Sequence, residues 1–353
     1  MSYITKPSAR HPRLPSNAVG LTVRDYEGSM STLCAGCGHD SVTAALVQAF
    51  FELDIEPHRV AKLSGIGCSS KTPAYFVSEA HGFNSVHGRM PAIAAGANAA
   101  NRDLLYVGIS GDGDSLSIGL GQFCHAIRRN VNMLYVLENN GVYGLTKGQF
   151  SASADVGSTS KRGEVNEQGP IDPVTLALAL GATFVARTFS GDKAQLIPIL
   201  QAGLTHNGFA FVDVISPCVT FANNDESLKS YGYVKSHDEE LHVVDYIPHF
   251  EPITEVEVPE GEFREVQLHD GSFIRLETIG DAHDPASEMA ALEALHRAEV
   301  AQKHVTGLLY FNPGKPTLDE TLNLVETPLA ELPDERLKPS RESLEELLAG
   351  FRS

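Results

Sequence analysis

Hydrophobic residues in the first two thirds of the chain fall into two kinds of segment that alternate. Residues 104–110 and 131–137 are continuous apolar runs that end in glycine-rich or asparagine-rich loops, as buried strands do. Segments with apolar residues at near-helical spacing lie between such runs. We therefore expect helices that begin near Ser41 and cover roughly 115–129, 173–180 and 193–204, with further strands over 182–187 and 209–215.

This order of strands and helices predicts an α/β fold with a parallel sheet, helices on both of its faces, and functional loops at the carboxyl ends of the strands. We place this domain at residues 30–230. Residues 1–29 are expected to form an extended N-terminal arm, since 1–20 carry three prolines and no periodic pattern. Residues 231–353 are expected to form an extension that wraps the core or a partner subunit. Within it, 251–268 has short β-like runs, and 285–302 and 341–351 have a helical pattern.

Composition and charge narrow the class of protein. The chain has 353 residues, of which 42% are hydrophobic and 20% are charged, which fits folded domains with real cores. The formal net charge of −18 disfavours nucleic acid and anionic membranes as partners, and residues 231–353 carry −16 of it. No apolar run approaches the roughly 20 residues of a membrane helix, and the N-terminus is too polar for a signal peptide. We expect a cytoplasmic protein.

Two neighbouring strand ends carry candidate metal ligands. Gly111, Asp112 and Gly113 follow the first buried run, and Asn139 and Asn140 follow the next one. Glycine lets a backbone approach a diphosphate closely, while carboxylate, amide and main-chain oxygens are ligands suited to Mg²⁺. Either loop alone is compatible with an ordinary turn. The pair, 28 positions apart from Asp112 to Asn140, favours a cofactor site.

Four of the five cysteines lie in short motifs, and three of these are at loop positions where glycine or proline bends the backbone. Cys34 and Cys37 form a Cys-x-x-Cys pair, whereas Cys68 and Cys218 come singly after predicted strands. Four thiolates hold either zinc or an iron-sulfur cluster, and their spacing leaves that choice open. A redox cluster beside a cofactor whose intermediate is a strong reductant would have a chemical purpose, which favours iron and sulfur. Cys124 lies in a predicted helix with apolar neighbours and is interpreted as an inert core thiol.

The order strand, GDG, helix, strand and NN resembles the thiamine diphosphate motif of transketolases, pyruvate decarboxylases and 2-oxoacid oxidoreductases. Over residues 30–225, the chain more specifically resembles the β subunit of 2-oxoacid:ferredoxin oxidoreductases, and most of all the 2-oxoglutarate branch. The motifs that carry this resemblance are CAGCGHD, GIGCSS, HGRMPAIAAGAN, GDGDSLSIG, AIRRN, NNGVYGLTKGQ and SPC. Where that family often has GQASPT, this chain has GQFSAS from Gly148, which puts the role of this loop in doubt.

The resemblance implies the residues that hold each group. The ligands of a 4Fe-4S cluster would be Cys34, Cys37, Cys68 and Cys218, and those of Mg²⁺ would be Asp112, Asn140 and the carbonyl of Val142. The segments touching thiamine diphosphate would contain Ile66, Gly67, Cys68, Ser69, Gly113, Asp114, Asn140, Gly144 and Leu145. His87 and Arg89 would lie near the reacting carbon, although a lone histidine is often structural.

The resemblance also implies the reaction, which is oxidative decarboxylation of 2-oxoglutarate with coenzyme A to succinyl-CoA and carbon dioxide. Electrons would pass through the cluster to ferredoxin, and strongly reducing ferredoxin would drive the reverse reaction, carbon dioxide fixation. An α subunit is expected to complete the site, because no recognisable motif supplies the glutamate that thiamine enzymes need. Lys147 is expected to pair with the distal carboxylate of 2-oxoglutarate, the alternative being a solvated surface lysine. Two other functions stay open, a cluster-free thiamine decarboxylase or synthase and a zinc-stabilised non-catalytic subunit.

Overall fold

The centre of the computed structural model is an eight-stranded sheet; the structure describes residues 13–224, 227–248, 263–267, 270–278 and 283–351. Its six parallel strands, in spatial order, are β2 (His81–Asn84), β1 (Val60–Ser64), β3 (Leu105–Gly111), β4 (Met133–Asn139), β8 (Phe209–Ile215) and β7 (Phe184–Phe189). β13 (His304–Phe311) follows antiparallel to β7, and β9 (Asp238–Glu240) closes that edge. The predicted α/β class with a mostly parallel sheet is confirmed.

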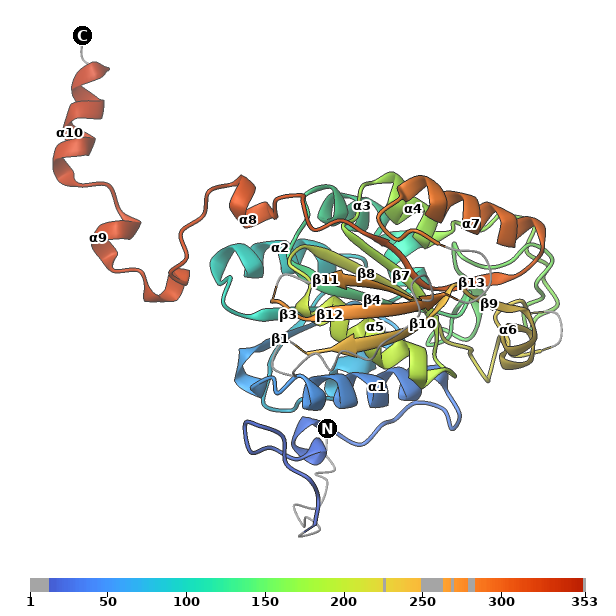
Figure 1. Ribbon diagram of the computed structural model, residues 1–353. Coiled ribbons are helices and arrows are strands. Elements are labelled where there is room, and N and C mark those ends of the chain that lie inside the picture. The colour runs from blue at the N-terminus through green and yellow to red at the C-terminus, as the bar shows by residue number, and fades with distance from the viewer. Residues whose placement is uncertain (1–12, 225–226, 249–262, 268–269, 279–282, 352–353) are drawn as a thin grey trace.

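Helices cover both faces of this sheet (Figure 1). One face is packed by α1 (Gly38–Glu52) and α5 (Lys193–Thr205), and the other by α2 (Met90–Ala100), α3 (Leu120–Arg128), α4 (Pro173–Ala179) and α7 (Glu288–Val300). Side chains of a strand alternate between the two cores, as the pleat of a sheet requires. In β4, Leu134 and Val136 face the first core, whereas Tyr135 and Leu137 face the second.

The helix expected over 115–129 is divided in two. A π-helical turn, η4 (Gly113–Ile118), starts directly after β3, and α3 begins after it. The N–H of Gly119 closes this turn on the carbonyl of Asp114, five residues earlier, at 2.8 Å. The spacing of hydrophobic residues does not predict where η4 ends and α3 begins, because the π turn is defined by backbone hydrogen bonds near the glycine loop. Such turns occur often at functional sites.

Residues beyond 230 take part in the main sheet as well as extending it. They include α6 (Tyr231–His237), β9, α7 and β13, and also a three-stranded antiparallel sheet of β10 (His242–Ile247), β12 (Phe273–Thr278) and β11 (Phe263–Gln267). Val244 and Tyr246 of β10 belong to the same core as α1 and α5. The region thus contributes strands to the main sheet and side chains to its core, whereas the wrapping role expected for it stays a prediction. Of the segment with β-like runs, residues 251–262 and 268 lie outside the described residues.

Two short segments flank this body. The C-terminal tail contains α8 (Leu318–Thr321), the turn η5 (Leu329–Glu331), α9 (Asp334–Leu337) and α10 (Arg341–Gly350), and it leads away from the sheet (Figure 1). Every residue from 333 to 350 is exposed. At the other end, residues 1–12 of the predicted arm lie outside the described residues, and the turn η1 (Val23–Tyr26) anchors the rest because Tyr26 is fully buried.

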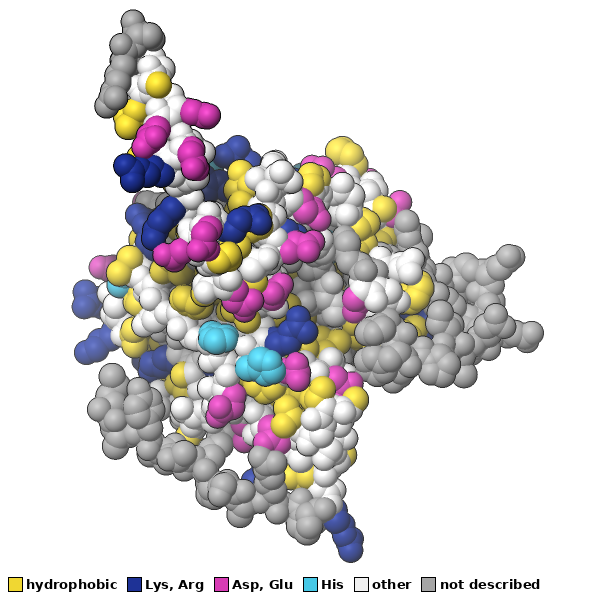
Figure 2. Space-filling model, turned by 90° about the vertical axis from the view of Figure 1, so that its left-hand side faces the viewer, with side chains coloured by type: hydrophobic (Ala, Val, Ile, Leu, Met, Phe, Trp, Pro, Cys, Tyr) yellow, Lys and Arg dark blue, Asp and Glu magenta, His cyan; other side chains and the backbone are white. Residues whose placement is uncertain are grey.

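On the face shown in Figure 2, acidic and basic side chains are interspersed over the body and the C-terminal tail. No helix among the described residues is both long enough and apolar enough to cross a membrane.

Candidate active site

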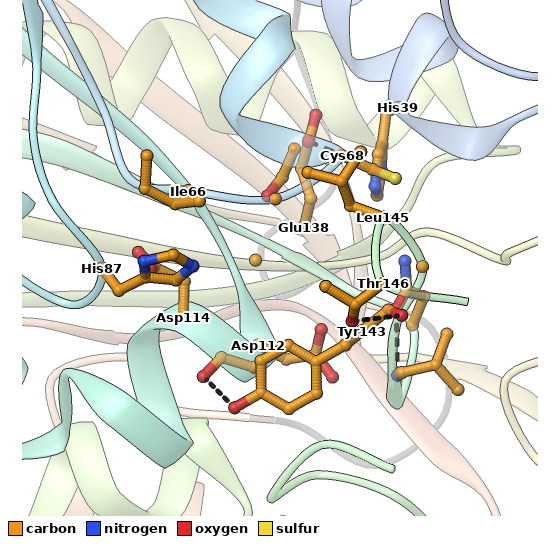
Figure 3. Close-up of a pocket in the computed structure, with 17 residues that line it drawn as sticks. His39, Ile66, Cys68, His87, Asp112, Asp114, Glu138, Tyr143, Leu145 and Thr146 are labelled. Carbon is orange, nitrogen blue, oxygen red and sulfur yellow. Dashed lines mark hydrogen bonds and ion pairs between the residues drawn. The ribbon is translucent and has the colours of Figure 1, made fainter. Parts of the chain in front are cut away.

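A pocket lies at the carboxyl ends of β1, β3 and β4. All ten residues that the motifs predicted to touch thiamine diphosphate line it, including His87 and Asn140. Figure 3 shows His87 and Asp114 at one side of this pocket, and Cys68, Glu138 and His39 at the other. Neighbouring parallel strands end at the same edge of a sheet, which is why loops that are distant in sequence meet here.

Close backbone packing shapes the floor of the pocket. An added Cβ at Gly113 would lie 2.4 Å from the ring of Tyr143, so no larger residue fits there without movement. The Tyr143 hydroxyl donates to the carbonyl of Gly113 at 2.9 Å, which joins the two strand-end loops. The glycine loop therefore has no side chain at position 113 that would block a ligand. Tyr143 also lines the pocket, and the sequence motifs assigned it no role.

Asp112 is buried in this floor and takes part in a dense set of hydrogen bonds. Its Oδ2 accepts the N–H of Gly141 at 2.9 Å, the hydroxyl of Ser153 at 2.7 Å and the hydroxyl of Ser151. Burial raises the pKa of the Asp112 carboxyl, although both serine hydroxyls lower it. The GQFSAS loop, whose role the sequence left in doubt, therefore supplies two hydroxyls to this carboxylate.

Asn140 and Val142 lie beside Asp112 in the same pocket. The Asn140 Oδ1 accepts the N–H of Val142 at 3.1 Å, so its amide oxygen is directed at the loop that contains Val142. A buried carboxylate, an amide oxygen and a main-chain carbonyl in one pocket are a donor set of the kind that suits Mg²⁺ and a diphosphate. The residues present fit that group.

Asp114 positions a different loop. Its Oδ1 accepts the N–H of Gly88 at 2.8 Å, and its Oδ2 accepts the hydroxyl of Ser110 at 2.8 Å. Gly88 stands between His87 and Arg89, so this bond holds the HGR segment against the pocket. His87 lines the pocket and is exposed, whereas Arg89 is exposed at the start of α2 and is not a lining residue.

The structure adds two titratable residues, Glu138 and His39, to the pocket wall. The fully buried Glu138 carboxylate accepts the Thr72 hydroxyl at 3.0 and 3.1 Å, and the Nδ1 of His39 lies 3.5 Å from it. Burial raises the pKa of Glu138 well above its ordinary value and lowers that of His39 to about 4. Glu138 directly precedes the two asparagines and His39 ends the sequence CAGCGH, so proximity to these motifs was the available signal.

The four motif cysteines gather at the rim beside Gly144. An added Cβ on Gly144 would lie 3.3 Å from the Cys68 sulfur and 3.8 Å from the Cys218 sulfur. The Thr220 hydroxyl lies 3.4 Å from the Cys34 sulfur, and Cys37 caps the start of α1. Burial raises the pKa of Cys37 to about 12, and it also raises that of Cys68, helped by the nearby Cys218.

The spacing of these thiols bears on what they suit. Within the described ranges, no three His, Cys, Asp or Glu side chains are grouped tightly enough for one metal ion. A four-iron cluster spaces its thiolate ligands more widely than one tetrahedral zinc ion does. The choice between zinc and a cluster for these cysteines stays a prediction. Cys124 lies apart from it, in α3.

Lys147 occupies an exposed position next to the pocket. Thr146 and Leu145 line the pocket, whereas Lys147 does not. Its backbone is left-handed, with φ of 84°, a conformation that is uncommon for residues other than glycine. The predicted substrate lysine is thus near the cofactor loop but not enclosed by this chain.

Together, the parallel sheet and the pocket at its strand ends define a thiamine diphosphate enzyme domain. The family described as thiamine pyrophosphate enzyme, C-terminal TPP binding domain, matches residues 65–214. The chain belongs to the β subunits of 2-oxoacid:ferredoxin oxidoreductases, as its motifs indicated.

Two archaeal relatives show this membership. The chain is 40% identical over 221 residues to the 2-oxoacid:ferredoxin oxidoreductase subunit beta of Saccharolobus solfataricus, covering 62% of this chain and 70% of that protein. It is 35% identical over 294 residues to the 2-oxoacid:ferredoxin oxidoreductase 1 subunit beta of Aeropyrum pernix, covering 83% and 81%.

One solved structure extends the similarity to nearly the whole chain. It is a 2-oxoglutarate:ferredoxin oxidoreductase from Magnetococcus marinus with 2-oxoglutarate, coenzyme A and succinyl-CoA bound. The TM-score is 0.73 at 30% sequence identity, with 95% of this chain and 98% of that chain covered. The protein is therefore an oxidoreductase subunit that depends on thiamine diphosphate.

Proposed function

We propose that this chain, with an α subunit, catalyses the oxidative decarboxylation of 2-oxoglutarate with coenzyme A and passes the electrons to ferredoxin. The observation that carries the proposal is one pocket that joins the GDG and NN strand ends to a rim of cysteines. Thiamine diphosphate, when bound, supplies the carbon nucleophile that makes decarboxylation of a 2-oxoacid feasible. The names of the relatives support ferredoxin as acceptor, and the Magnetococcus marinus structure supports 2-oxoglutarate as substrate.

Three groups of the chain would anchor the cofactor through Mg²⁺. These are the free oxygen of the Asp112 carboxylate, the Asn140 amide oxygen and the carbonyl of Val142, all at the pocket floor. Asp112 is buried with neutral hydrogen-bond donors and no direct ion pair, so a cation would compensate its charge. His87 would act on the reacting end of the substrate, because it lines the opposite side and Asp114 fixes its loop.

Cys34, Cys37, Cys68 and Cys218 would hold a 4Fe-4S cluster, which supplies the route for electrons out of the pocket. Cys68 both lines the pocket and stands beside Cys218, so the electron path would be short. Cluster formation would require deprotonation of thiols whose pKa values burial raises. Binding of the thiolates to the positive iron ions would offset the free energy needed to deprotonate these thiols, as metal binding generally does.

The cysteine assignment is tested by iron and acid-labile sulfide analysis of anaerobically purified protein. We expect a full cluster in Cys124→Ser, because Cys124 lies in α3 away from the rim, and loss of the cluster in Cys218→Ser. Zinc in place of iron would support the non-catalytic alternative. A full cluster in Cys218→Ser with loss in Cys124→Ser would show that the ligand set is wrong.

The α subunit would complete the site by adding the glutamate that thiamine enzymes place against the aminopyrimidine. Glu138 is the one glutamate among the residues lining the described pocket, and its carboxylate is already engaged by Thr72 beside His39. We therefore expect the isolated chain to be inactive and the reconstituted complex to turn over. Robust turnover by this chain, verified free of a copurifying subunit and lost in Glu138→Gln, would assign the role to Glu138 instead.

A further inference from the structure

The two oxygens of the Asp112 carboxylate have different surroundings. Oδ2 accepts three hydrogen bonds, from the Gly141 N–H and from the hydroxyls of Ser151 and Ser153. No hydrogen bond from another side chain in the described residues goes to Oδ1. Apart from a hydrogen bond with its own backbone, the carboxylate thus receives its donors on one oxygen.

The two serines are themselves held in place. The Ser153 N–H donates to the Ser151 oxygen at 3.3 Å, and the Ser153 carbonyl accepts the ammonium of Lys229 at 2.8 Å. The Ser153 hydroxyl has three acceptors within reach, which are Asp112 Oδ2 at 2.7 Å, Asn139 Oδ1 at 2.9 Å and the Ser151 hydroxyl oxygen at 3.1 Å. Its single proton goes to the carboxylate, because charged acceptors form the stronger bond.

Asn139 connects this pair to a buried ionic row. Its amide Nδ2 donates to Asp213 Oδ1 at 3.1 Å, and Asp213 Oδ2 accepts the Nε of Arg187 at 2.9 Å. The orientation of the Asn139 amide is fixed by that bond, so its oxygen stays toward Ser153. Asn139 therefore packs against Ser153 without receiving its proton, and the Ser153 backbone is held by the bond of its carbonyl to Lys229.

We propose that Ser151 and Ser153 make the metal site selective for Mg²⁺ over Ca²⁺ by limiting Asp112 to a single ligand oxygen. The inference rests on the proposed function, in which Asp112 binds the cation. Mg²⁺ requires six ligands in near-octahedral geometry and is satisfied by one oxygen of a carboxylate. Ca²⁺ takes six to eight ligands and often binds both oxygens of one carboxylate, which the serines prevent here.

The test is calorimetric titration of the reconstituted complex with thiamine diphosphate, in the presence of Mg²⁺ alone or Ca²⁺ alone. The readout is the ratio of the dissociation constant with Ca²⁺ to that with Mg²⁺. We expect a ratio well above one for the unaltered protein, and a ratio about tenfold smaller for the double variant Ser151→Ala, Ser153→Ala, since Oδ2 then keeps only the Gly141 N–H and can act as a second ligand for Ca²⁺. Affinity with Mg²⁺ should change less than affinity with Ca²⁺.

Ser117→Ala is the matched control, because the Ser117 hydroxyl accepts the N–H of Ala152 in the same loop without touching Asp112. It should keep the ratio of the unaltered protein. If the double variant does not fold, each single variant should give a ratio between the two. An unchanged ratio in folded serine variants overturns this inference and leaves the proposed function standing. Cofactor binding that needs no divalent cation in the unaltered protein overturns the Mg²⁺ site and the inference with it.

Discussion

Two buried aspartates, Asp213 within β8 and Asp112 just after β3, differ in their electrostatic surroundings. Asp213 on β8 is paired with Arg187, which also forms an ion pair with Asp172 at the start of α4. Burial alone would lower the pKa of Arg187, but the two carboxylates raise it, so the guanidinium stays charged. Asp112 after β3 has only neutral donors around it. The first region pairs its carboxylate directly with a cation. In the second, the Lys229 ammonium lowers the pKa of Asp112 without bonding to it, and it forms its ion pair with Asp155 instead.

The difference indicates which of the two carboxylates has a structural role and which a ligand-binding role. A buried charge with a partner inside the chain is compensated on folding, whereas an uncompensated one costs stability until something positive binds. The ionic row across β8 and β7 therefore contributes to the frame of the sheet. The carboxylate at the GDG loop is held ready for an external cation. Substitutions of Asp112 and Arg187 test this comparison, and substitution of Lys147 tests the neighbouring substrate site.

Asp112→Ala should abolish Mg²⁺-dependent binding of thiamine diphosphate, because the diphosphate loses the carboxylate that anchors its cation. Calorimetric titration of the complex measures the loss. Asp103→Ala is the control, since Asp103 is an exposed aspartate just before the other end of β3. Unchanged cofactor affinity in Asp112→Ala would mean that the cofactor binds elsewhere. Asp112 would then lack the ligand-binding role that distinguishes it from Asp213.

Arg187→Met should lower the free energy of unfolding by about 3–5 kcal/mol, because it leaves Asp213 buried without its partner. Urea denaturation of the cofactor-free chain measures this change. Asp112→Asn is the matched variant. It removes a buried charge while keeping an oxygen for the three donors, so we expect no loss of stability. Equal destabilisation by both variants would contradict the distinction between the two aspartates.

Lys147→Met should reduce kcat/KM for 2-oxoglutarate by roughly tenfold or more, the scale of a charge-assisted hydrogen bond, with little effect on pyruvate or 2-oxobutyrate. Steady-state assays of the complex with the three 2-oxoacids measure the effect. The exposure of Lys147 means that a neighbouring subunit would have to exclude water there. Lys193→Met, at an exposed lysine that begins α5 after β7, is the control. A loss shared by all three substrates would rule out recognition of the distal carboxylate.

Much of this architecture follows from local patterns of sequence. The hydrophobic runs predicted β3, β4 and β8. They also predicted where the loops after β3 and β4 begin. Loops after adjacent parallel strands must meet, so residues such as Asp112 and Asn140 were expected in one pocket before any contact was known. These site residues could be predicted from the sequence because each motif is short and directly follows a clear hydrophobic run that marks a strand.

The remaining site residues depend on contacts between distant segments. Thr72 meets Glu138 across 66 positions, and His39 meets Ser216 across 177. Ser151 and Ser153 belong to a loop with no periodic signal, and their role appears only where they reach Asp112. No local pattern encodes such pairings, because they arise from how the finished sheet packs.

The position of β13 has a consequence for how the chain is made. This strand, residues 304–311, pairs with β7, residues 184–189, so the sheet cannot close until most of the polypeptide has left the ribosome. Until then β7 is an edge with unpaired backbone groups, and all six of its residues are ones that the native fold buries. Such an edge is a template for pairing with other chains. Synthesis of this subunit therefore includes an interval of aggregation hazard that ends only when its last sheet strand arrives.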